Sequence, residues 1–450
     1  MHDRRRSKRD ERVRRLFISS LILLYCSIGA FAQAQRSLLG ARRTDVDVTR
    51  DTTLDVALPS GFVLSGKILV DDPLSVMGSA VLARSNDRTF SGEITVDFSI
   101  AGLTAAYRIV LPAGNYRLYF RRLILEDSEA GEGAVLQVVS DLSRTVAITA
   151  DRTLDITPPQ LPGLISLSGR ITSAGRFPAK GFLLFSSADG NVSALVPFDP
   201  TYRARLLPGS YTVTAWITDP EREDADWTSV RLGQISVSAS STRDFTLPAA
   251  IELSGRVTRA TGSPAVPAQV IAIATADLAK LPSDAEWACE SGAVRFDLPV
   301  VSAMTRIPEE SATGAYRLLL VPGTYRLNAE VDLDPNDETN PRLSFSFLER
   351  ALTADTTQNF TLPSLPSFVT LSGRITDQRG QPVARAFVFA TTSTLSGTPN
   401  AAFTAATEAD AQGRYRLRLL SGRAYQITIC PPTPSPTLPS GLRARRHSSF

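Results

Sequence analysis

Clustered carboxylates on a loop are the residues of this chain that could bind a metal ion. The oxygen-bearing side chains between positions 332 and 337 are Asp332, Asp334, Asn336 and Asp337. Their spacing begins like an EF-hand calcium loop, but the sixth position is Asp337 instead of glycine and the twelfth is Leu343 instead of glutamate. We therefore favour a solvated loop tip here and keep a calcium site as the alternative.

Two tryptophans could offer a flat surface to a sugar. Trp216 shares one face of a predicted strand with Thr212 and Thr214, and the opposite face of that strand is the one that we expect to be buried. Trp227 follows close behind in the sequence, and exposed indole rings can stack on a glycan. Two other repeats of the chain lack tryptophan at the equivalent position. A packed tryptophan is therefore favoured, and a glycan platform of Trp216 and Trp227 is the alternative.

The histidine count excludes most acid–base and zinc chemistry. The chain has two histidines, His2 and His447, at its extreme ends. Catalytic triads and most catalytic zinc sites need histidine inside the folded region. The acidic residues form no pair in a setting typical of glycoside hydrolases, and there is no glycine-rich phosphate loop. The sequence therefore predicts no catalytic residue, no cofactor-binding residue and no enzyme activity.

The first 34 residues have the layout of a secretory signal peptide. A basic region ends at Arg14 and Arg15, an apolar run follows from Leu16 to Ala32, and small residues at Ala32 and Ala34 suit signal peptidase. An uncleaved membrane anchor is the alternative, because the run is just long enough to span a bilayer. The two arginines also permit twin-arginine export, although general secretion is favoured. We expect a secreted, periplasmic or cell-surface protein without a membrane span once the leader is removed.

The charge of the chain is concentrated in that leader. The net charge is +3 over 450 residues, while the first 32 residues carry eight Lys or Arg and three Asp or Glu. The remainder is therefore slightly acidic, which does not suit a phosphate backbone, and we expect no nucleic acid partner.

Two cysteines, Cys289 and Cys430, remain after the leader. An oxidising compartment would let them form a disulfide. They lie in different repeats, so two separate thiols are favoured, and the disulfide is the alternative.

Three short motifs recur four times and divide the chain into repeats. The first motif is L-S-G followed by a basic and a β-branched residue, and its glycines are Gly66, Gly169, Gly255 and Gly373. The second is a tyrosine followed seven residues later by glycine and soon by another tyrosine; the pairs are Tyr107/Tyr116, Tyr202/Tyr211, Tyr316/Tyr325 and Tyr415/Tyr425. Alternating apolar residues around the glycine indicate a β-hairpin.

The third motif is a short strand carrying an acidic or amide residue ahead of each L-S-G. Its polar residues are Asp55, Asp155, Asp244 and Asn359. We interpret this strand as the last one of a repeat, although it could instead open the next repeat. With the first phasing, the strand at Leu54–Val56 precedes repeat one without a repeat of its own, and repeat four lacks its last strand.

The pattern predicts an all-β protein of tandem antiparallel β-sandwich repeats, of the transthyretin or immunoglobulin-like kind. Long amphipathic helical patterns are absent from the sequence. The predicted divisions are a signal peptide 1–34, a lead-in segment 35–60 with one strand, repeats 61–160, 161–249, 250–365 and 366–430, and a Pro-rich and basic tail 431–450.

The repeats resemble carboxypeptidase regulatory-like domains, which have transthyretin-like or carbohydrate-binding-like folds. Repeat four carries the resemblance best, in Gly373–Asp377, Gly380–Val383, Ala386–Val388, Asp410–Tyr415 and Leu420–Gly422. The resemblance implies accessory or structural modules, frequent on secreted bacterial proteins. The family's peptidase chemistry belongs to a separate zinc domain that needs histidine ligands, so no peptidase activity is implied for this chain.

These observations predict an exported, non-enzymatic rod of four repeats with a structural, adhesive or spacer role at the cell surface or in the periplasm. A carbohydrate-binding protein and an accessory chain of an extracellular hydrolase are the alternatives. Its partner would be an extracellular protein or a glycan. The strand at Leu54–Val56 could complete repeat four of another molecule, giving end-to-end self-association.

Overall fold

The computed structural model describes residues 39–70, 79–86, 91–96, 104–126, 134–218, 227–280, 302–392 and 402–432. These residues form β-strands and one short 3-10 helix, η2 (Thr275–Lys280), and no α-helix occurs among them. The predicted all-β fold class is confirmed. Within the same residues, no helix has the length and apolar character needed to cross a membrane.

Repeat two shows how a single repeat folds. Its strands are β11 (Ile165–Ser173), β12 (Gly181–Ser187), β13 (Val192–Phe198), β14 (Thr201–Leu206), β15 (Gly209–Thr218), β16 (Trp227–Val237), β17 (Ser241–Thr242) and β18 (Phe245–Leu247). An outer sheet contains β14, β11, β17 and β18, and an inner sheet has the order β13-β12-β15-β16. Because side chains alternate along a strand, Tyr211, Val213 and Ala215 of β15 enter the core between the sheets.

The other repeats have the same strand order. Repeat one contains β4 (Phe62–Leu69), β5 (Ser79–Ser85), β6 (Ser91–Val96), β7 (Thr104–Leu111), β8 (Gly114–Glu126), β9 (Ala134–Ile148) and β10 (Arg152–Thr153). Repeat three contains β19 (Ile251–Thr258), β20 (Ala268–Ala274), β21 (Ser302–Ile307), β22 (Ala315–Leu320), β23 (Gly323–Asp332), β24 (Arg342–Leu352), β25 (Thr356–Thr357) and β26 (Phe360–Thr361). Repeat four begins with β27 (Phe368–Asp377), β28 (Phe387–Thr392), β29 (Ala402–Glu408), β30 (Arg414–Leu420) and β31 (Arg423–Cys430).

The short strand of the third motif closes each repeat. It runs parallel to the L-S-G strand of the same repeat, with β10 on β4, β17 and β18 on β11, and β25 and β26 on β19. The sandwiches are therefore not purely antiparallel. The chain crosses from the last inner strand to the outer sheet, and it then runs in the same direction as the strand beside it.

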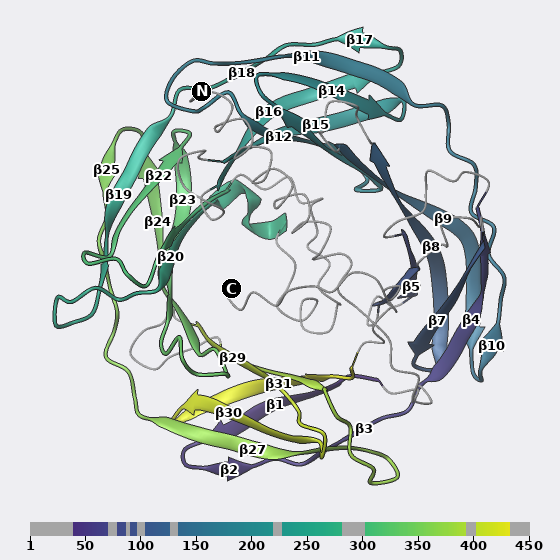
Figure 1. Cartoon of the computed structure of the whole chain (residues 1–450), viewed down its shortest axis with the longest axis vertical. Helices are drawn as coiled ribbons and strands as arrows, with labels where there is room; N and C mark the ends of the chain where they lie inside the picture. Colours follow the sequence, from purple (N-terminus) through teal and green to yellow (C-terminus); the bar gives the residue numbers. More distant parts are fainter. Residues whose placement is uncertain are drawn as a thin grey trace, which may run out of the picture.

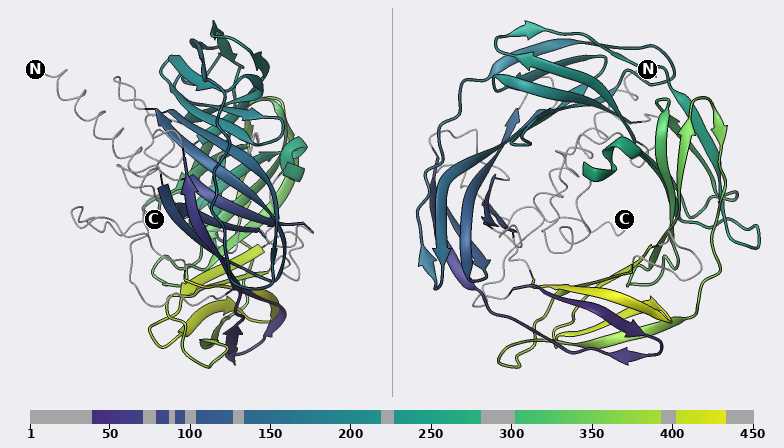
Figure 2. Two further views of the ribbon diagram at one scale, coloured as in Figure 1. Left: turned by 90° about the vertical axis from the view of Figure 1, so that its right-hand side faces the viewer. Right: turned by 180° about the vertical axis from the view of Figure 1, so that it is seen from behind.

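The four sandwiches are arranged in a ring, with the inner sheets facing its centre and the outer sheets facing outward (Figure 1, Figure 2). Three pairings join the inner sheets edge to edge: β9 with β13, β16 with β21, and β24 with β29. Each pairing joins the last inner strand of one repeat to the first edge strand of the next. The expectation of an extended rod is wrong, because the repeats curve until the first and last meet.

The N-terminal segment completes repeat four of its own chain. β1 (Ala41–Val48) pairs antiparallel with β31, while β2 (Thr52–Thr53) and β3 (Val56–Leu58) run parallel to β27. The strand at Leu54–Val56 therefore has its partner within the same molecule, not in a second copy as end-to-end association would require. Strand addition depends on an open edge, and ring curvature brings that edge beside the chain's own beginning.

Candidate functional site

Every repeat is closed by the same cluster of residues, which we call the clasp. A clasp consists of the L-S-G glycine, the first hairpin tyrosine and a backbone carbonyl of the closing strand. In each one the tyrosine hydroxyl donates a hydrogen bond to that carbonyl: Tyr107 to Leu154 at 2.6 Å, Tyr202 to Arg243 at 2.7 Å, Tyr316 to Gln358 at 2.6 Å and Tyr415 to Leu54 at 2.7 Å. The L-S-G and tyrosine motifs thus belong to one structural device.

The glycine is needed because the closing strand crosses directly over it. A Cβ atom on Gly373 would lie 2.0 Å from the carbonyl oxygen of Leu54, and one on Gly169 would lie 1.9 Å from that of Arg243. Such distances are far inside van der Waals contact, so any side chain would displace the closing strand.

The polar residue of the third motif forms the other half of the clasp. Its side-chain oxygen accepts a hydrogen bond from the backbone N–H of the basic residue after L-S-G. The pairs are Asp155 with Lys67 at 2.8 Å, Asp244 with Arg170 at 2.8 Å, Asn359 with Arg256 at 3.0 Å and Asp55 with Arg374 at 2.7 Å. An amide oxygen can replace the carboxylate at Asn359 because the bond needs only an acceptor.

Burial keeps the clasp tyrosines in the protonated, hydrogen-bond-donating form. It raises the pKa of Tyr107 to about 12 and moves the pKa values of Tyr202, Tyr316 and Tyr415 still further upward. The second hairpin tyrosines also donate to backbone carbonyls close in sequence: Tyr116 to Pro112 at 3.1 Å, Tyr211 to Leu207 at 2.7 Å, Tyr325 to Val321 at 2.8 Å and Tyr425 to Leu420 at 2.8 Å. Phenols held in this way serve as structural donors.

The fourth clasp joins the two ends of the described chain. Tyr415 and Leu54 are 361 residues apart in sequence, whereas the partners in the other clasps are separated by 47, 41 and 42 residues. A second carboxylate assists, because Asp51 accepts the N–H of Thr370 at 2.8 Å. The ring is therefore closed without a covalent bond at this clasp.

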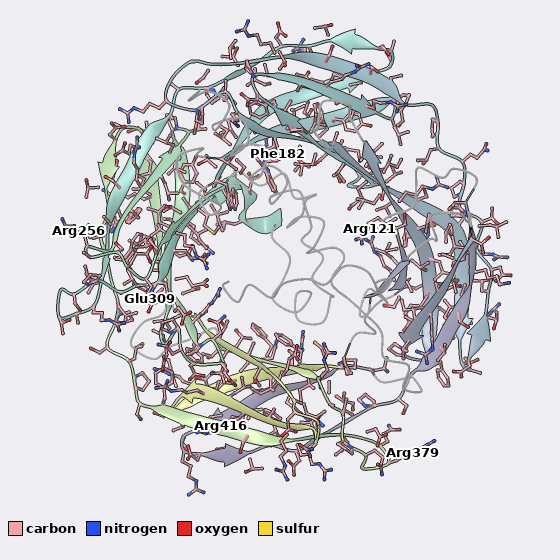
Figure 3. The ribbon with its side chains drawn as sticks, in the orientation of Figure 1. Arg121, Phe182, Arg256, Glu309, Arg379 and Arg416 are labelled. Carbon is pink, nitrogen blue, oxygen red and sulfur yellow. The ribbon has the colours of Figure 1, made fainter. Side chains whose placement is uncertain are left out.

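Trp216 and Trp227 lie next to each other on the inner sheet of repeat two, on the face that is turned toward the centre of the four-repeat ring. They lie on neighbouring strands, their ring centroids are 5.8 Å apart, and their planes differ by 22°. Both side chains are half-buried, and Trp216 faces away from the core residues of β15, as the alternation predicts. Phe182 stands opposite Trp216 on β12 and points toward the centre of the ring (Figure 3). The arrangement is an aromatic surface, and its glycan-binding role stays a prediction.

Two aspartates of the acidic loop after β23 form ion pairs with an arginine of repeat four. Arg418 of β30 lies between Asp334 and Asp337, at 2.5 and 3.2 Å from their carboxylate oxygens. Burial raises the pKa of Asp332. Burial would also raise that of Asp337, but hydrogen bonds from Thr339 and Arg418 outweigh it and lower the pKa. Within the described part of the chain, no group of three or more His, Cys, Asp or Glu side chains is placed to hold a metal ion. The calcium site stays a prediction.

Ion pairs that no short motif of the sequence predicts link neighbouring repeats. Arg418 links repeat four to the loop of repeat three. Arg231 of β16 contacts both oxygens of the buried Asp277 in η2, at 2.8 and 3.0 Å. Arg176 forms a two-pronged pair with Asp355 at 3.0 and 2.8 Å. No short-range pattern could reveal these partners, because 46 to 179 residues separate them in sequence.

Cys430, at the end of β31, is disulfide-bonded. The preference for a separate thiol is therefore wrong at this position. Cys26 and Cys289, the other cysteines, lie outside the described residues.

Comparison with known proteins gives only distant likenesses. No protein-family model matches the chain, and no curated protein sequence matches it. A leucine-rich repeat protein of Bacteroides thetaiotaomicron is 14% identical, with a TM-score of 0.19 over 42% of this chain, and the match spans only 26% of that protein. A minor pilin of Streptococcus agalactiae is 12% identical with a TM-score of 0.20, covering 41% of this chain and 96% of the pilin. A streptococcal ancillary pilin is 9% identical with a TM-score of 0.17, covering 67% of this chain and all of the pilin. These TM-scores are well under 0.5, so the likenesses carry no argument about function.

Proposed function

We propose that this chain is an exported, non-enzymatic ring of β-sandwich modules with a structural or adhesive role at the cell surface or in the periplasm. The single observation that carries the proposal is the closure of repeat four by residues 41–58 of the same chain. Closure fixes four modules around one centre and turns their outer sheets outward (Figure 1). A frame of this kind suits holding or contacting other surfaces.

The use of the recurring polar residues supports a non-enzymatic role. In all four clasps the tyrosine donates to a backbone carbonyl, and a side-chain oxygen, from aspartate in three clasps and from Asn359 in the other, accepts from a backbone N–H. Their recurrence is therefore explained by folding. The proposal includes kinship with the carboxypeptidase regulatory-like modules, whose resemblance rests on repeat four.

Location and surface role are tested together in cells of the source organism. The full chain with a C-terminal epitope should be accessible to protease added to intact or outer-membrane-permeabilised cells, while a chain lacking residues 2–34 should remain protected. Deleting the gene should weaken envelope integrity or adhesion to surfaces, and the wild-type chain should restore it. Retention of the full chain in the cytoplasm, or turnover of substrate by the purified protein in hydrolase screens, would contradict the proposal.

A carbohydrate-binding role is the second candidate, because Trp216 and Trp227 form a stacked, half-exposed pair. A glycan array should then detect binding by the wild-type protein and loss of binding in Trp216→Ala and Trp227→Ala. Phe387→Ala is the matched control, since Phe387 is an exposed aromatic residue of repeat four. Absence of binding by the wild type would end this candidate. An accessory role beside an extracellular hydrolase would require co-purification with that enzyme.

A further inference from the structure

The outward faces of the outer sheets carry a second recurring pattern, which the clasps do not use. The serine of L-S-G stands directly opposite the arginine that follows the first hairpin tyrosine; the pairs are Ser65/Arg108, Ser168/Arg203, Ser254/Arg317 and Ser372/Arg416. A basic residue follows each serine two positions later, and these exposed residues are Lys67, Arg170, Arg256 and Arg374. The clasps use only the backbone N–H of that basic residue. Closure of the repeats therefore does not explain why the charged side chains recur.

Repeat two presents this pattern with arginines and no carboxylate at the outward positions. Those positions are Ser166, Ser168, Arg170 and Thr172 on β11 and Thr201, Arg203 and Arg205 on β14. All three arginines are exposed. In the part of the chain that the structure describes, Arg170 and Arg203 form no ion pair. The carboxylate of Asp244 accepts the backbone N–H of Arg170, so it is held by the clasp.

Repeat four presents the pattern with a fourth arginine added. The outward positions are Thr370, Ser372, Arg374 and Thr376 on β27 and Arg414, Arg416 and Arg418 on β30. Arg374 stands directly opposite Arg414, and like charges at opposite positions of a sheet are destabilising. Arg418 pairs with the acidic loop of repeat three, but Arg374, Arg414 and Arg416 have no ion pair among the described residues. An external anion would relieve the repulsion between them.

Repeats three and one depart from this arrangement. Glu252 occupies in repeat three the position of Ser166 in repeat two, and Arg317 donates to it at 2.8 Å. Val63 occupies that position in repeat one and stands opposite Val110. A face that combines several arginines with no carboxylate is therefore a feature of repeats two and four. Their outer sheets lie on opposite sides of the ring, with β11 and β14 at the top of Figure 1 and β27 and β30 at the bottom.

The composition of these two faces indicates the chemical class of the ligand. A guanidinium group binds a carboxylate through two parallel hydrogen bonds. The other outward positions of β11 and β27 are serine or threonine, whose hydroxyls can donate to and accept from sugar hydroxyls. A polymer that carries both carboxylates and hydroxyls matches this surface, whereas an acidic peptide would leave the hydroxyls without equivalent partners. A flexible polymer can also reach both sides of the ring, while a flat membrane meets one side at a time.

We propose that the outer faces of repeats two and four each bind an acidic polysaccharide, through Arg170 and Arg203 in repeat two and Arg374 and Arg416 in repeat four. The inference rests on the proposed surface location, and it names the partner for the adhesive role. Two sites on opposite sides allow one ring to cross-link two glycan chains. Both sites lie on the outside of the ring, away from the aromatic surface that faces its centre.

Isothermal titration calorimetry with a short oligogalacturonate tests the proposal. The protein is the chain from residue 35 to 450, which contains every described residue and excludes the basic leader. The wild type should bind two oligosaccharides per chain, with an affinity that falls as salt is raised. The double variants Arg170→Gln/Arg203→Gln and Arg374→Gln/Arg416→Gln should each bind one, and the quadruple variant should bind none. With long polygalacturonate, light scattering should show cross-linked particles for the wild type and not for either double variant.

The matched control removes the same charge from repeat three. Arg256→Gln/Arg317→Gln should retain both sites, because Glu252 already engages Arg317. Trp216→Ala should also retain both sites, which separates this surface from the aromatic one. Should a glutamine variant fail to fold, as judged by circular dichroism, the corresponding lysine variant decides the result. Lysine keeps the charge without the planar fork, so binding at that site should weaken about threefold, and unchanged affinity would contradict the proposal.

Several results would overturn the proposal. Binding retained by the quadruple variant would place the ligand elsewhere, and equal losses in the control from repeat three would show attraction to net charge alone. Equally tight binding of neutral dextran oligosaccharides, of oligoglutamate or of phosphatidylglycerol vesicles would exclude an acidic polysaccharide as the specific partner. Absence of binding by the wild type would overturn this inference alone, because the protease test in cells decides the proposed location independently.

Discussion

The hydroxyl of Tyr415 donates a hydrogen bond of 2.7 Å to the carbonyl oxygen of Leu54, near the opposite end of the described chain. Three identical bonds elsewhere close repeats one to three locally, so this bond is the one whose loss would affect the whole ring. Tyr415 is 4% exposed. Loss of its hydroxyl would leave the carbonyl of Leu54 without this hydrogen-bond donor.

Replacing Tyr415 by phenylalanine should reduce the stability of repeat four by about 1 kcal/mol, because the partly buried carbonyl of Leu54 loses its donor. Scanning calorimetry should show a lower transition, and hydrogen exchange of residues 52–58 should quicken. Tyr202→Phe is the matched control: it removes the same bond in repeat two and should leave exchange at 52–58 unchanged. An unaltered exchange rate at 52–58 in Tyr415→Phe would show that this bond does not hold the ring closed.

Replacing Gly373 by alanine should open the ring, because the added Cβ would lie 2.0 Å from the carbonyl oxygen of Leu54. The clasp cannot form around such a contact, so we expect a larger radius of gyration by small-angle X-ray scattering. Gly163→Ala is the control, since a Cβ there meets no atom within 4 Å. Identical scattering curves for the two variants would contradict the assigned role of the glycine.

Removing residues 35–58 should leave repeat four without β1, β2 and β3, and a separate peptide of residues 41–58 should bind the truncated chain. Val56 and Leu58 are 2% and 0% exposed, so their burial drives this binding. Fluorescence anisotropy with the labelled peptide measures it, and a peptide carrying Val56→Ser and Leu58→Ser should bind at least tenfold more weakly. The intact mature chain should remain monomeric in light scattering over a wide concentration range. Concentration-dependent dimers would instead indicate exchange of this segment between copies.

Stability should fall at alkaline pH because of the buried tyrosines. The pKa values of Tyr107, Tyr211 and Tyr325 are raised to about 12 in the folded chain, above the ordinary value of 10.0. Above pH 10 the unfolded chain loses phenol protons that the folded chain retains, which favours unfolding. The contribution is complete below pH 10 and is lost as pH rises to about 12. Urea unfolding at pH 9 and 11 measures the loss, which should be smaller in Tyr107→Phe; an equal loss would exclude this tyrosine as a source.

Cys430 is disulfide-bonded, and Cys26 and Cys289 are the other cysteines of the sequence, so a disulfide in a chain that lacks residues 1–34 should join Cys430 to Cys289. Peptide mapping without reductant should recover the two cysteines in one linked fragment. Reduction should lower the unfolding transition by an amount corresponding to roughly 2–4 kcal/mol, since the link restrains the unfolded chain. Two free thiols in mature protein isolated from the envelope would contradict this.

Local patterns made part of this architecture predictable. The alternation of apolar residues in strands such as β15 fixed the buried face of each strand, including the outward placement of Trp216. The fixed spacing from tyrosine to glycine predicted the hairpins. The glycine of L-S-G was recognisable as a repeated motif residue, but the reason why glycine is needed there was not. The carbonyl that packs against Gly373 belongs to Leu54, which is more than 300 residues away in the sequence.

The sequence by itself determined the β class and the four copies of the motifs, since both follow from residue types and short spacings, whereas the leader stays a prediction. Only the tertiary structure decided that the copies form a ring, that residues 41–58 belong to repeat four, and that Arg418 contacts Asp334 and Asp337. The physical reason is that backbone hydrogen bonding is nearly independent of side-chain identity, so any free edge can accept any strand. Which strand pairs with which edge depends on the total curvature of the four repeats, and no short motif of the sequence encodes that curvature.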